Sequence, residues 1–200
     1  MFKILDEVCT PKRGAKYSAY VDLFAREDVT IGAGETKIVK LGVKIDFEKL
    51  KEKILKNPID FIGLAGEFTT LLSDDTIIQR ALKSNYLEIA LRSSLGAKGL
   101  IIANGIGIID LDYPDEIGLI MHNPFSLEQV RIWNKQNIGN EVSFEYRTKE
   151  FFKISKGDKV AQCTLKEHKG YLMGYESDVV RTGGFGSTEC IHSNLGCIPT

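Results

Sequence analysis

The stretch from Gly105 to Tyr113, Gly-Ile-Gly-Ile-Ile-Asp-Leu-Asp-Tyr, combines two glycines, a run of apolar residues and two carboxylates. This composition is typical of a buried strand that leaves a tight turn. Asp110 and Asp112 stand two positions apart, and side chains with that spacing point to the same face of a strand. Burying Asp110 behind Ile108 and Ile109 would cost several kcal/mol unless the carboxylate is paired or hydrogen-bonded. The stretch indicates either a site whose chemistry needs a carboxylate or a carboxylate that caps a hairpin turn.

A second pattern lies near the end of the chain, in Arg181–Thr188, Arg-Thr-Gly-Gly-Phe-Gly-Ser-Thr. Glycines let backbone N–H groups approach an anion, hydroxyls add donors, and Arg181 can grip a phosphate through two parallel hydrogen bonds. Phe185 stands among glycines and is expected to stack on something flat, such as a base. No lysine follows the glycines, so the segment is not a Walker loop. It predicts an arm that orders over a nucleotide, with an ordinary flexible tail as the alternative.

Composition narrows the class of protein. The chain has 200 residues and a formal net charge of −1, so no electrostatic field argues for nucleic acid or an acidic membrane surface. Its four cysteines lack C-x-x-C spacing and matching histidines, which argues against zinc and against a disulfide scaffold. Charges interrupt the first nine residues, and the longest apolar run is too short to span a bilayer. We therefore expect a reduced, cytoplasmic protein without a membrane segment.

The elements that would position these residues read mainly as β-strands. Strand-like stretches at 20–25, 36–45, 86–123 and 151–165, separated by glycine-containing turns, favour an all-β sandwich or barrel. Residues 46–84 instead show helical spacing, with Asp46 and Ser73 as candidate caps. We expect this helical excursion to pack over one flank of the sheet, with a lid or partner surface as the alternative. Residues 124–150 form a second interruption.

Five short motifs in this order resemble those of the trimeric dUTP diphosphatases (dUTPases). The first resembles residues 19–25, and the third runs from Asn104 to Tyr113. Together the five cover most of the chain outside the two interruptions. The other three are Arg92-Ser93-Ser94-Leu95, Gly157-Asp158-Lys159-Val160-Ala161-Gln162 and the Arg181–Thr188 segment.

The resemblance implies a distorted jelly-roll β-barrel with a helical insertion, and hydrolysis of dUTP to dUMP and pyrophosphate. It implies a domain at 1–180 with insertions at about 46–84 and 124–146, and a glycine-rich arm at 181–200. A homotrimer is implied, in which each site combines residues of neighbouring chains. The insertions resemble those of phage-encoded dUTPases, which would place the protein in a host cytoplasm, and they are candidate surfaces for a protein partner.

The resemblance also implies roles for individual residues. Asp110 matches the general base that deprotonates a water for attack on the α-phosphorus. Asp22 matches an acidic position near a phosphate-bound Mg²⁺, in its outer shell through water, with no protein cage around the ion. The remaining matches are to substrate-binding residues. Those for the base and sugar are Asn104, Gly107, Ile108, Ile109, Tyr113 and Phe185, and those for the phosphates are Arg92, Ser93, Ser94, Gln162, Arg181, Gly186, Ser187 and Thr188.

Several positions depart from the family pattern, and two other functions remain open. Tyr20 and Ser94 stand where glycines are usual, Pro114-Asp115 replaces an x-Gly turn, and Glu189 replaces a terminal glycine. These changes bear on phosphate geometry rather than on the reaction. One alternative is a dCTP deaminase of the same fold, although that family lacks the Ile-Asp-x-Asp-Tyr stretch. The other is a nucleotide-sensing regulator that binds a partner through its insertions.

Overall fold

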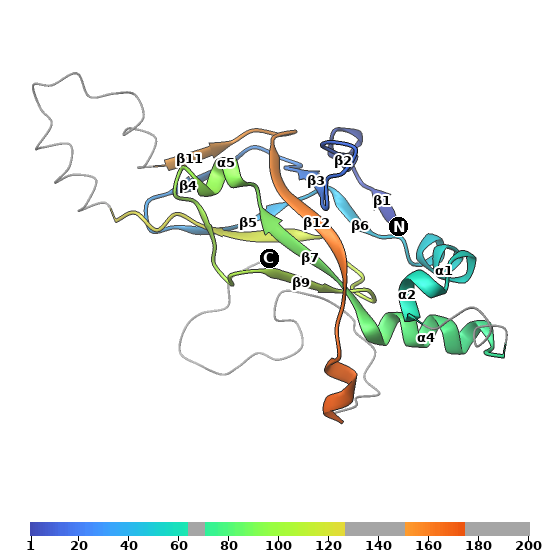
Figure 1. Ribbon diagram of the computed structural model, residues 1–200. Helices are drawn as coiled ribbons and strands as arrows, with labels where there is room; N and C mark the ends of the chain where they lie inside the picture. Colours follow the sequence, from blue (N-terminus) through green and yellow to red (C-terminus); the bar gives the residue numbers. More distant parts are fainter. Residues whose placement is uncertain (64–70, 127–150, 175–200) are drawn as a thin grey trace, which may run out of the picture.

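A computed structural model describes residues 1–63, 71–126 and 151–174 (Figure 1). Strands predominate in these ranges, and they pair into four sheets without forming a closed ring among the described residues. The expected mainly β, jelly-roll-like fold is therefore confirmed in class. No helix in these ranges is long and apolar enough to cross a bilayer.

The largest sheet has five strands in the order β2-β3-β12-β7-β9, and each pair of neighbours is antiparallel. Its odd-numbered β7 residues Leu87 and Ile89 are buried, while the even-numbered ones face outward and are partly exposed. This alternation is the period-2 signature of a strand with one face on the core. The strands are β2 (Lys12–Arg13), β3 (Val21–Phe24), β12 (Lys159–Glu167), β7 (Asn85–Leu91) and β9 (Gly107–Asp110).

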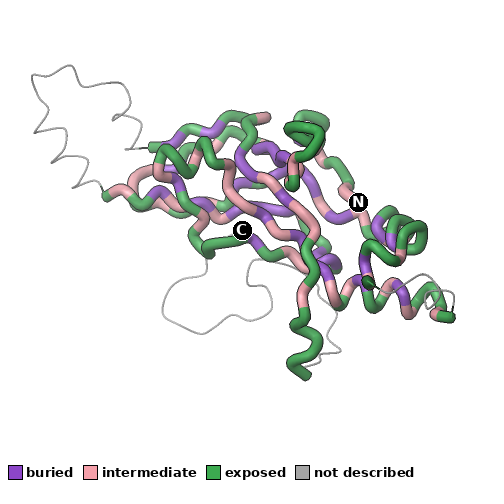
Figure 2. Tube along the Cα trace, in the orientation of Figure 1, coloured by how far each residue is buried: buried purple, intermediate pink, exposed green. Residues whose placement is uncertain are grey.

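Three smaller sheets pack around this one. A three-stranded sheet has the order β5-β10-β8, and two further pairs join β1 to β6 and β11 to β4. Their inward side chains complete one hydrophobic core. The chain positions of the buried residues are purple along the tube in Figure 2. These strands are β1 (Phe2–Ile4), β4 (Val29–Gly32), β5 (Thr36–Lys40), β6 (Val43–Ile45), β8 (Ile101–Ile102), β10 (Gly118–His122) and β11 (Phe151–Ile154).

The single strand-like stretch expected at 36–45 is two strands in the structure. β5 and β6 are separated at Gly42, whose φ of 62° lies in the left-handed region that favours glycine. A Cβ atom at Gly42 would also lie 2.5 Å from the buried Cys9 Sγ. The chain therefore turns between sheets at this point, which the continuous β-branched pattern concealed.

The helices expected between residues 46 and 84 are present and pack beside the start of β7 (Figure 1). The Asp46 side chain accepts from Lys49 N at 3.2 Å at the start of α1 (Phe47–Lys56), and Ser73 Oγ accepts from Thr76 N at the start of α4 (Asp74–Ser84). Both are side-chain N-caps. Apolar side chains on these helices and on α2 (Ile59–Ile62) belong to the central core. They are Leu50, Ile54, Phe61, Ile77 and Ala81.

Three short helical turns complete the described chain. They are η1 (Glu7–Cys9), α5 (Ser93–Gly96) and η2 (Gly170–Met173). Residues 155–158 form a turn between β11 and β12, in which Gly157 has a φ of 85° and Asp158 N donates to Ser155 O. A hydrogen-bonded turn runs from Asp110 to Tyr113, in which Tyr113 N donates to Asp110 O at 3.1 Å. Most of the second interruption expected at 124–150, residues 127–150, lies outside the described residues.

Candidate active site

The first half of the candidate site is the C-terminal end of β9, which pairs with β7 at the edge of the five-stranded sheet. Gly107 permits this pairing, because a Cβ atom there would lie 3.0 Å from the Ile89 Cβ atom and 3.4 Å from the Ile89 carbonyl oxygen. Beyond the strand, Tyr113 is buried in the core at 6% exposure. The close approach at one end and the buried ring at the other fix the short segment that carries Asp110.

Gly107→Ala is expected to weaken this strand pairing and destabilise the protein by about 1–3 kcal/mol, the usual range for overpacking a well-packed interior. The added methyl group would contact backbone atoms of Ile89, which cannot rotate aside as the end of a side chain can. Urea unfolding, followed by far-UV circular dichroism, measures the change in the free energy of unfolding. Gly105→Ala is a contrasting variant, since a Cβ atom there meets nothing within 4 Å and its cost comes from the φ of 77° alone. An unchanged midpoint in Gly107→Ala would mean that β9 is not closely held.

Asp110 lies on the outward face of the sheet and is half-buried. The expectation that it is buried behind two isoleucines is wrong, because Ile108 shares its face and is 60% exposed. Asp112 lies beyond the strand, in the turn, and is exposed, so the two carboxylates do not occupy one strand face. Asp110 is thus accessible from outside while one flank is covered by β7.

The Asn104–Gly105 turn leads into β9. It is closed by Gly105 N donating to Ile102 O at 3.0 Å, with Gly105 at a φ of 77°. The strands on either side, β8 and β9, belong to different sheets rather than to one hairpin. Asn104 is exposed at the tip of this turn. The backbone here therefore passes from one sheet to the other at the start of β9, three residues before the end of the strand that carries Asp110.

The second half of the candidate site is a charged cluster at the far end of the same sheet. Asp22 on β3 is only 2% exposed, and its Oδ1 accepts from Arg92 Nη1 at 2.5 Å. Lys159 Nζ lies 3.2 Å from Asp22 Oδ2. That contact is an ion pair without hydrogen-bond geometry, because Oδ2 has no hydrogen-bond partner in the structure. Asp22 therefore holds two cations in place and keeps one buried oxygen available as an acceptor.

Three more of the expected phosphate-binding positions lie at this end. Gln162 is directly opposite Asp22 in the pairing of β12 with β3, and residues directly opposite each other share a face. Ser93 and Ser94 are exposed in the first turn of α5. Arg92 precedes that turn and is anchored by its N–H, which donates to Val160 O at 3.0 Å. The five-stranded sheet thus gathers Asp22, Arg92, Gln162 and the two serines.

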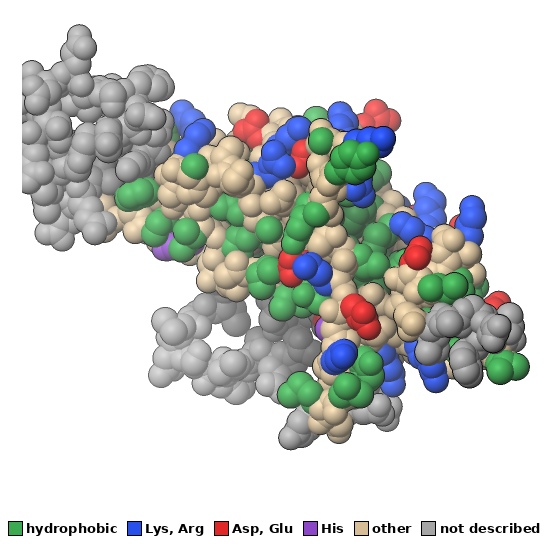
Figure 3. Space-filling model, in the orientation of Figure 1, with side chains coloured by type: hydrophobic (Ala, Val, Ile, Leu, Met, Phe, Trp, Pro, Cys, Tyr) green, Lys and Arg blue, Asp and Glu red, His purple; other side chains and the backbone are tan. Residues whose placement is uncertain are grey.

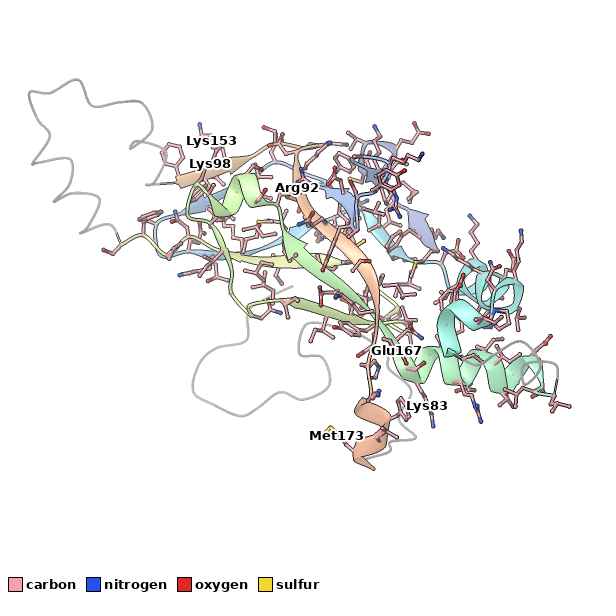
Figure 4. All side chains as sticks on the ribbon, viewed as in Figure 1. Lys83, Arg92, Lys98, Lys153, Glu167 and Met173 are labelled. Carbon is pink, nitrogen blue, oxygen red and sulfur yellow. The ribbon has the colours of Figure 1, made fainter. Side chains whose placement is uncertain are left out.

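Asp110 and the charged cluster are far apart within one chain. Asp110 is opposite Tyr86 at the start of β7, whereas Arg92 follows the end of that strand. Arg92 is six residues beyond Tyr86, and at a rise of about 3.3 Å per residue the two positions are roughly 20 Å apart along the strand. In Figure 4, Arg92 lies at one end of the sheet and Glu167, the strand partner of Asn85, lies near the other. A single triphosphate cannot touch both groups of the same chain.

Sequence reasoning missed a polar network beside Asp110. Glu88 on β7 accepts from the hydroxyls of both Tyr20 and Tyr86, the latter at 3.3 Å, and lies 3.9 Å from Lys166 Nζ. The outward period-2 positions of β7 were the signal that could have found Tyr86 and Glu88. The expected arm residues lie outside the described residues, so their positions stay predictions: Arg181, Phe185, Gly186, Ser187 and Thr188.

Magnesium was expected from the family resemblance, with no protein cage. Among residues 1–63, 71–126 and 151–174, no group of three or more His, Cys, Asp or Glu side chains could hold a metal ion. The buried Asp22 Oδ2 lacks a hydrogen-bond partner and can accept from a water molecule. This donor set fits an ion that is carried by ligand phosphates and waters, with Asp22 reaching it through water.

Comparison with known proteins points to one class. No protein-family model matches the chain. Two curated relatives are deoxyuridine 5′-triphosphate nucleotidohydrolases, from Rickettsia felis (27% identical) and Rickettsia massiliae (26% identical). Each matches over 185 residues, which is 89% of this chain and 86% of the relative.

Solved structures give the same class. The dUTPase from phage phi11 of S. aureus has a TM-score of 0.51 at 17% identity and covers 94% of this chain and 97% of its own. A mutant of that dUTPase, whose structure reveals coordination of a structural Mg(II) ion, has a TM-score of 0.52 at 17% identity, covering 92% and 97%. The fold is that of the dUTPases. The resemblance to dUTPases that the five motifs indicated is confirmed by the curated relatives.

Proposed function

We propose that this chain is a dUTP diphosphatase, which hydrolyses dUTP to dUMP and pyrophosphate in the cytoplasm. The observation that carries the proposal is that both curated relatives, matched over 86% of their length, are dUTP nucleotidohydrolases. An accessible, half-buried carboxylate on a firmly held strand end is consistent with that chemistry. The described cysteines Cys9 and Cys163 are free and buried, which is compatible with a reducing compartment.

In the proposed mechanism Asp110 takes a proton from the water that attacks the α-phosphorus. A positioned proton acceptor is typically worth about 10²–10⁴-fold in rate. The backbone from Gly107 to Ile109, with Asn104, reads the uracil edge, and Tyr113 packs under the deoxyribose. Recognition by strand backbone rejects cytosine because donors and acceptors are exchanged. Arg181 and Phe185 of the arm cover the phosphates and the base.

The phosphate chain is held by the charged cluster. Arg92, Ser93, Ser94 and Gln162 supply donors, and Asp22 keeps the Arg92 guanidinium in place through the 2.5 Å contact. Mg²⁺, when it accompanies the triphosphate, would neutralise phosphate charge, with Asp22 Oδ2 accepting from one of its waters. Positioned charge of this kind provides most of the catalysis in phosphoryl-type displacement.

A complete site requires two copies of the chain. The roughly 20 Å between the levels of Asp110 and Arg92, estimated from strand rise, exceeds what one triphosphate spans. Asp110 of one copy must therefore meet the charged cluster of another. The family resemblance implies that the assembly is a homotrimer, in which each interface would form a site. We accordingly place residues 1–180 in one β domain with its insertions and residues 181–200 in an arm over the site.

The decisive experiment is a pyrophosphate-release assay of the purified chain with Mg²⁺ and each of dATP, dCTP, dGTP, dTTP and dUTP. Release from dUTP alone is expected. Ammonia is measured in parallel with dCTP, because a deaminase of the same fold would release it. Ammonia from dCTP, or pyrophosphate from all five nucleotides equally, would reject the proposed function.

A further inference from the structure

Tyr86 stands directly opposite Asp110 in the pairing of β7 with β9. Such residues share a face of the sheet, with Cβ atoms roughly 4.5–5.5 Å apart. Because the strand order is β12-β7-β9, the Tyr86 side chain lies between Asp110 on one side and β12 on the other. On the outward face, Tyr86 therefore flanks Asp110 on the side toward the centre of the sheet. On its other side β9 is the edge of the sheet.

The Tyr86 ring is held at two places. Its hydroxyl donates to Glu88 Oε2 at 3.3 Å, two residues further along the same face. Its ring meets the His168 ring edge-on, with centroids 5.8 Å apart, just beyond the end of β12. The hydrogen bond at the hydroxyl and the contact with the His168 ring together restrict how far the Tyr86 ring can turn away from Asp110.

The acceptor Glu88 is itself held. Its side chain is 15% exposed, and its carboxylate accepts from the Tyr20 hydroxyl and lies 3.9 Å from Lys166 Nζ. Desolvation and the neighbouring Glu88 charge raise the pKa of Tyr86, so the Tyr86 hydroxyl stays protonated as a donor. Figure 3 shows acidic and basic side chains next to each other on this face of the molecule. Side chains from β7, from β12 and from the residue before β3 thus form one network around the Tyr86 ring, beside Asp110.

We propose that Tyr86 is a positioning residue for Asp110: its ring, braced through Glu88 to Tyr20 and against His168, restricts the carboxylate to the orientation that takes the proton from the attacking water. This inference rests on the proposed function for its kinetic meaning. Tyr86 touches neither the nucleotide nor the water in this scheme, and acts only through Asp110. A displacement of about 1 Å at a reacting group costs up to about 10²-fold in rate, so holding the carboxylate matters.

The kinetic test compares Tyr86→Phe and Tyr86→Ala with wild type. Tyr86→Ala should lower kcat by about 10–100-fold with little change in KM, because the ring is lost. Tyr86→Phe keeps the ring and loses one hydrogen bond, so its kcat should fall only about 2–10-fold. Phe151→Ala is the matched control, a partly exposed aromatic on β11 in another sheet. Equal kcat values in all four proteins would overturn the proposal, as would a rise in KM alone.

A double-mutant cycle separates positioning from general loss of structure. If Tyr86 acts through Asp110, adding Tyr86→Ala to Asp110→Asn should lower the residual rate no further. A full additional loss in the double variant would mean that Tyr86 acts elsewhere and would overturn the proposal. Thermal unfolding of Tyr86→Phe should stay close to wild type, so the Phe variant keeps the test valid if the Ala variant folds poorly.

A readout without substrate distinguishes this inference from the proposed function. In ¹³C-aspartate-labelled protein, the Asp110 carboxyl signal is assigned by its disappearance in Asp110→Asn. That signal should move in Tyr86→Ala and stay in place in Phe151→Ala. An unmoved signal would overturn the placement of Tyr86 against Asp110. An inactive wild-type protein would instead reject the proposed function, while the carboxyl signal still decides whether the ring controls its surroundings.

Discussion

Asp110→Asn is expected to abolish dUTP turnover while dUTP binding persists. An amide has nearly the same shape as the carboxylate but cannot accept a proton at neutral pH, so kcat should fall by at least about 10²–10⁴-fold. The hydrogen-bonded turn from Asp110 to Tyr113 uses the backbone oxygen of residue 110, which the substitution leaves intact. Steady-state pyrophosphate release measures the loss, and calorimetric titration with a non-hydrolysable dUTP analogue measures binding.

The control for this substitution is Asp112→Asn, which removes an exposed carboxylate two residues further along the same turn. Its kcat should remain within about 3-fold of wild type, because exposed charges away from the reacting atoms contribute little. If Asp110→Asn loses affinity without a separate defect in kcat, the carboxylate binds substrate and is not the base. Equal losses in both variants would point to the charge of the turn as a whole.

Mixing two inactive variants should restore activity. Asp110→Asn damages one half of the site, and Arg92→Lys damages the other while keeping a positive charge beside Asp22. Lysine cannot reproduce the planar guanidinium fork, so Arg92→Lys alone should also be poorly active. In randomly mixed symmetric oligomers, about one quarter of the interfaces combine an intact Asp110 with an intact Arg92 from another copy. About one quarter of wild-type turnover is therefore expected after co-refolding.

As a control, each variant is unfolded and refolded alone, which shows how much turnover refolding itself restores. Differently tagged subunits, purified over both tags in sequence, establish that mixed oligomers have formed. If mixed oligomers are isolated and turnover stays at the level of the two parents, then Asp110 and Arg92 serve the same site within one chain. That result would contradict the two-copy site that the roughly 20 Å separation along β7 requires.

Local patterns predicted most of the individual elements. The caps at Asp46 and Ser73 each specify a helix start through contacts within a few residues, and both are present as expected. The five motifs indicated the dUTPase fold because they combine local chemistry with order along the chain. Resemblance over most of the chain could therefore identify the fold without knowledge of any contact.

Contacts between distant residues could not be predicted in the same way. The buried ion pair of Asp22 with Arg92 joins residues 70 positions apart, and the Tyr20–Glu88 contact joins residues 68 apart. Neither spacing leaves a periodic signal in the sequence. The prediction that Ile108 helps to bury Asp110 was wrong for a related reason. Because β9 is an edge strand, its outward side chains have a neighbouring strand on one side only. Whether an apolar strand lies at an edge depends on the whole sheet.

The buried side chain of Asn85 links the helices to the strand that carries half of the candidate site. Its amide donates to Phe61 O at 2.7 Å and to Ala81 O at 2.9 Å, and the next residue in the chain is Tyr86. Helices α1, α2 and α4 also contribute five side chains to the central core. Deleting residues 46–84 would therefore leave the Asn85 amide without these two carbonyl acceptors and would remove five side chains from the core, so the segment cannot be cut out or transferred to a relative as an independent unit.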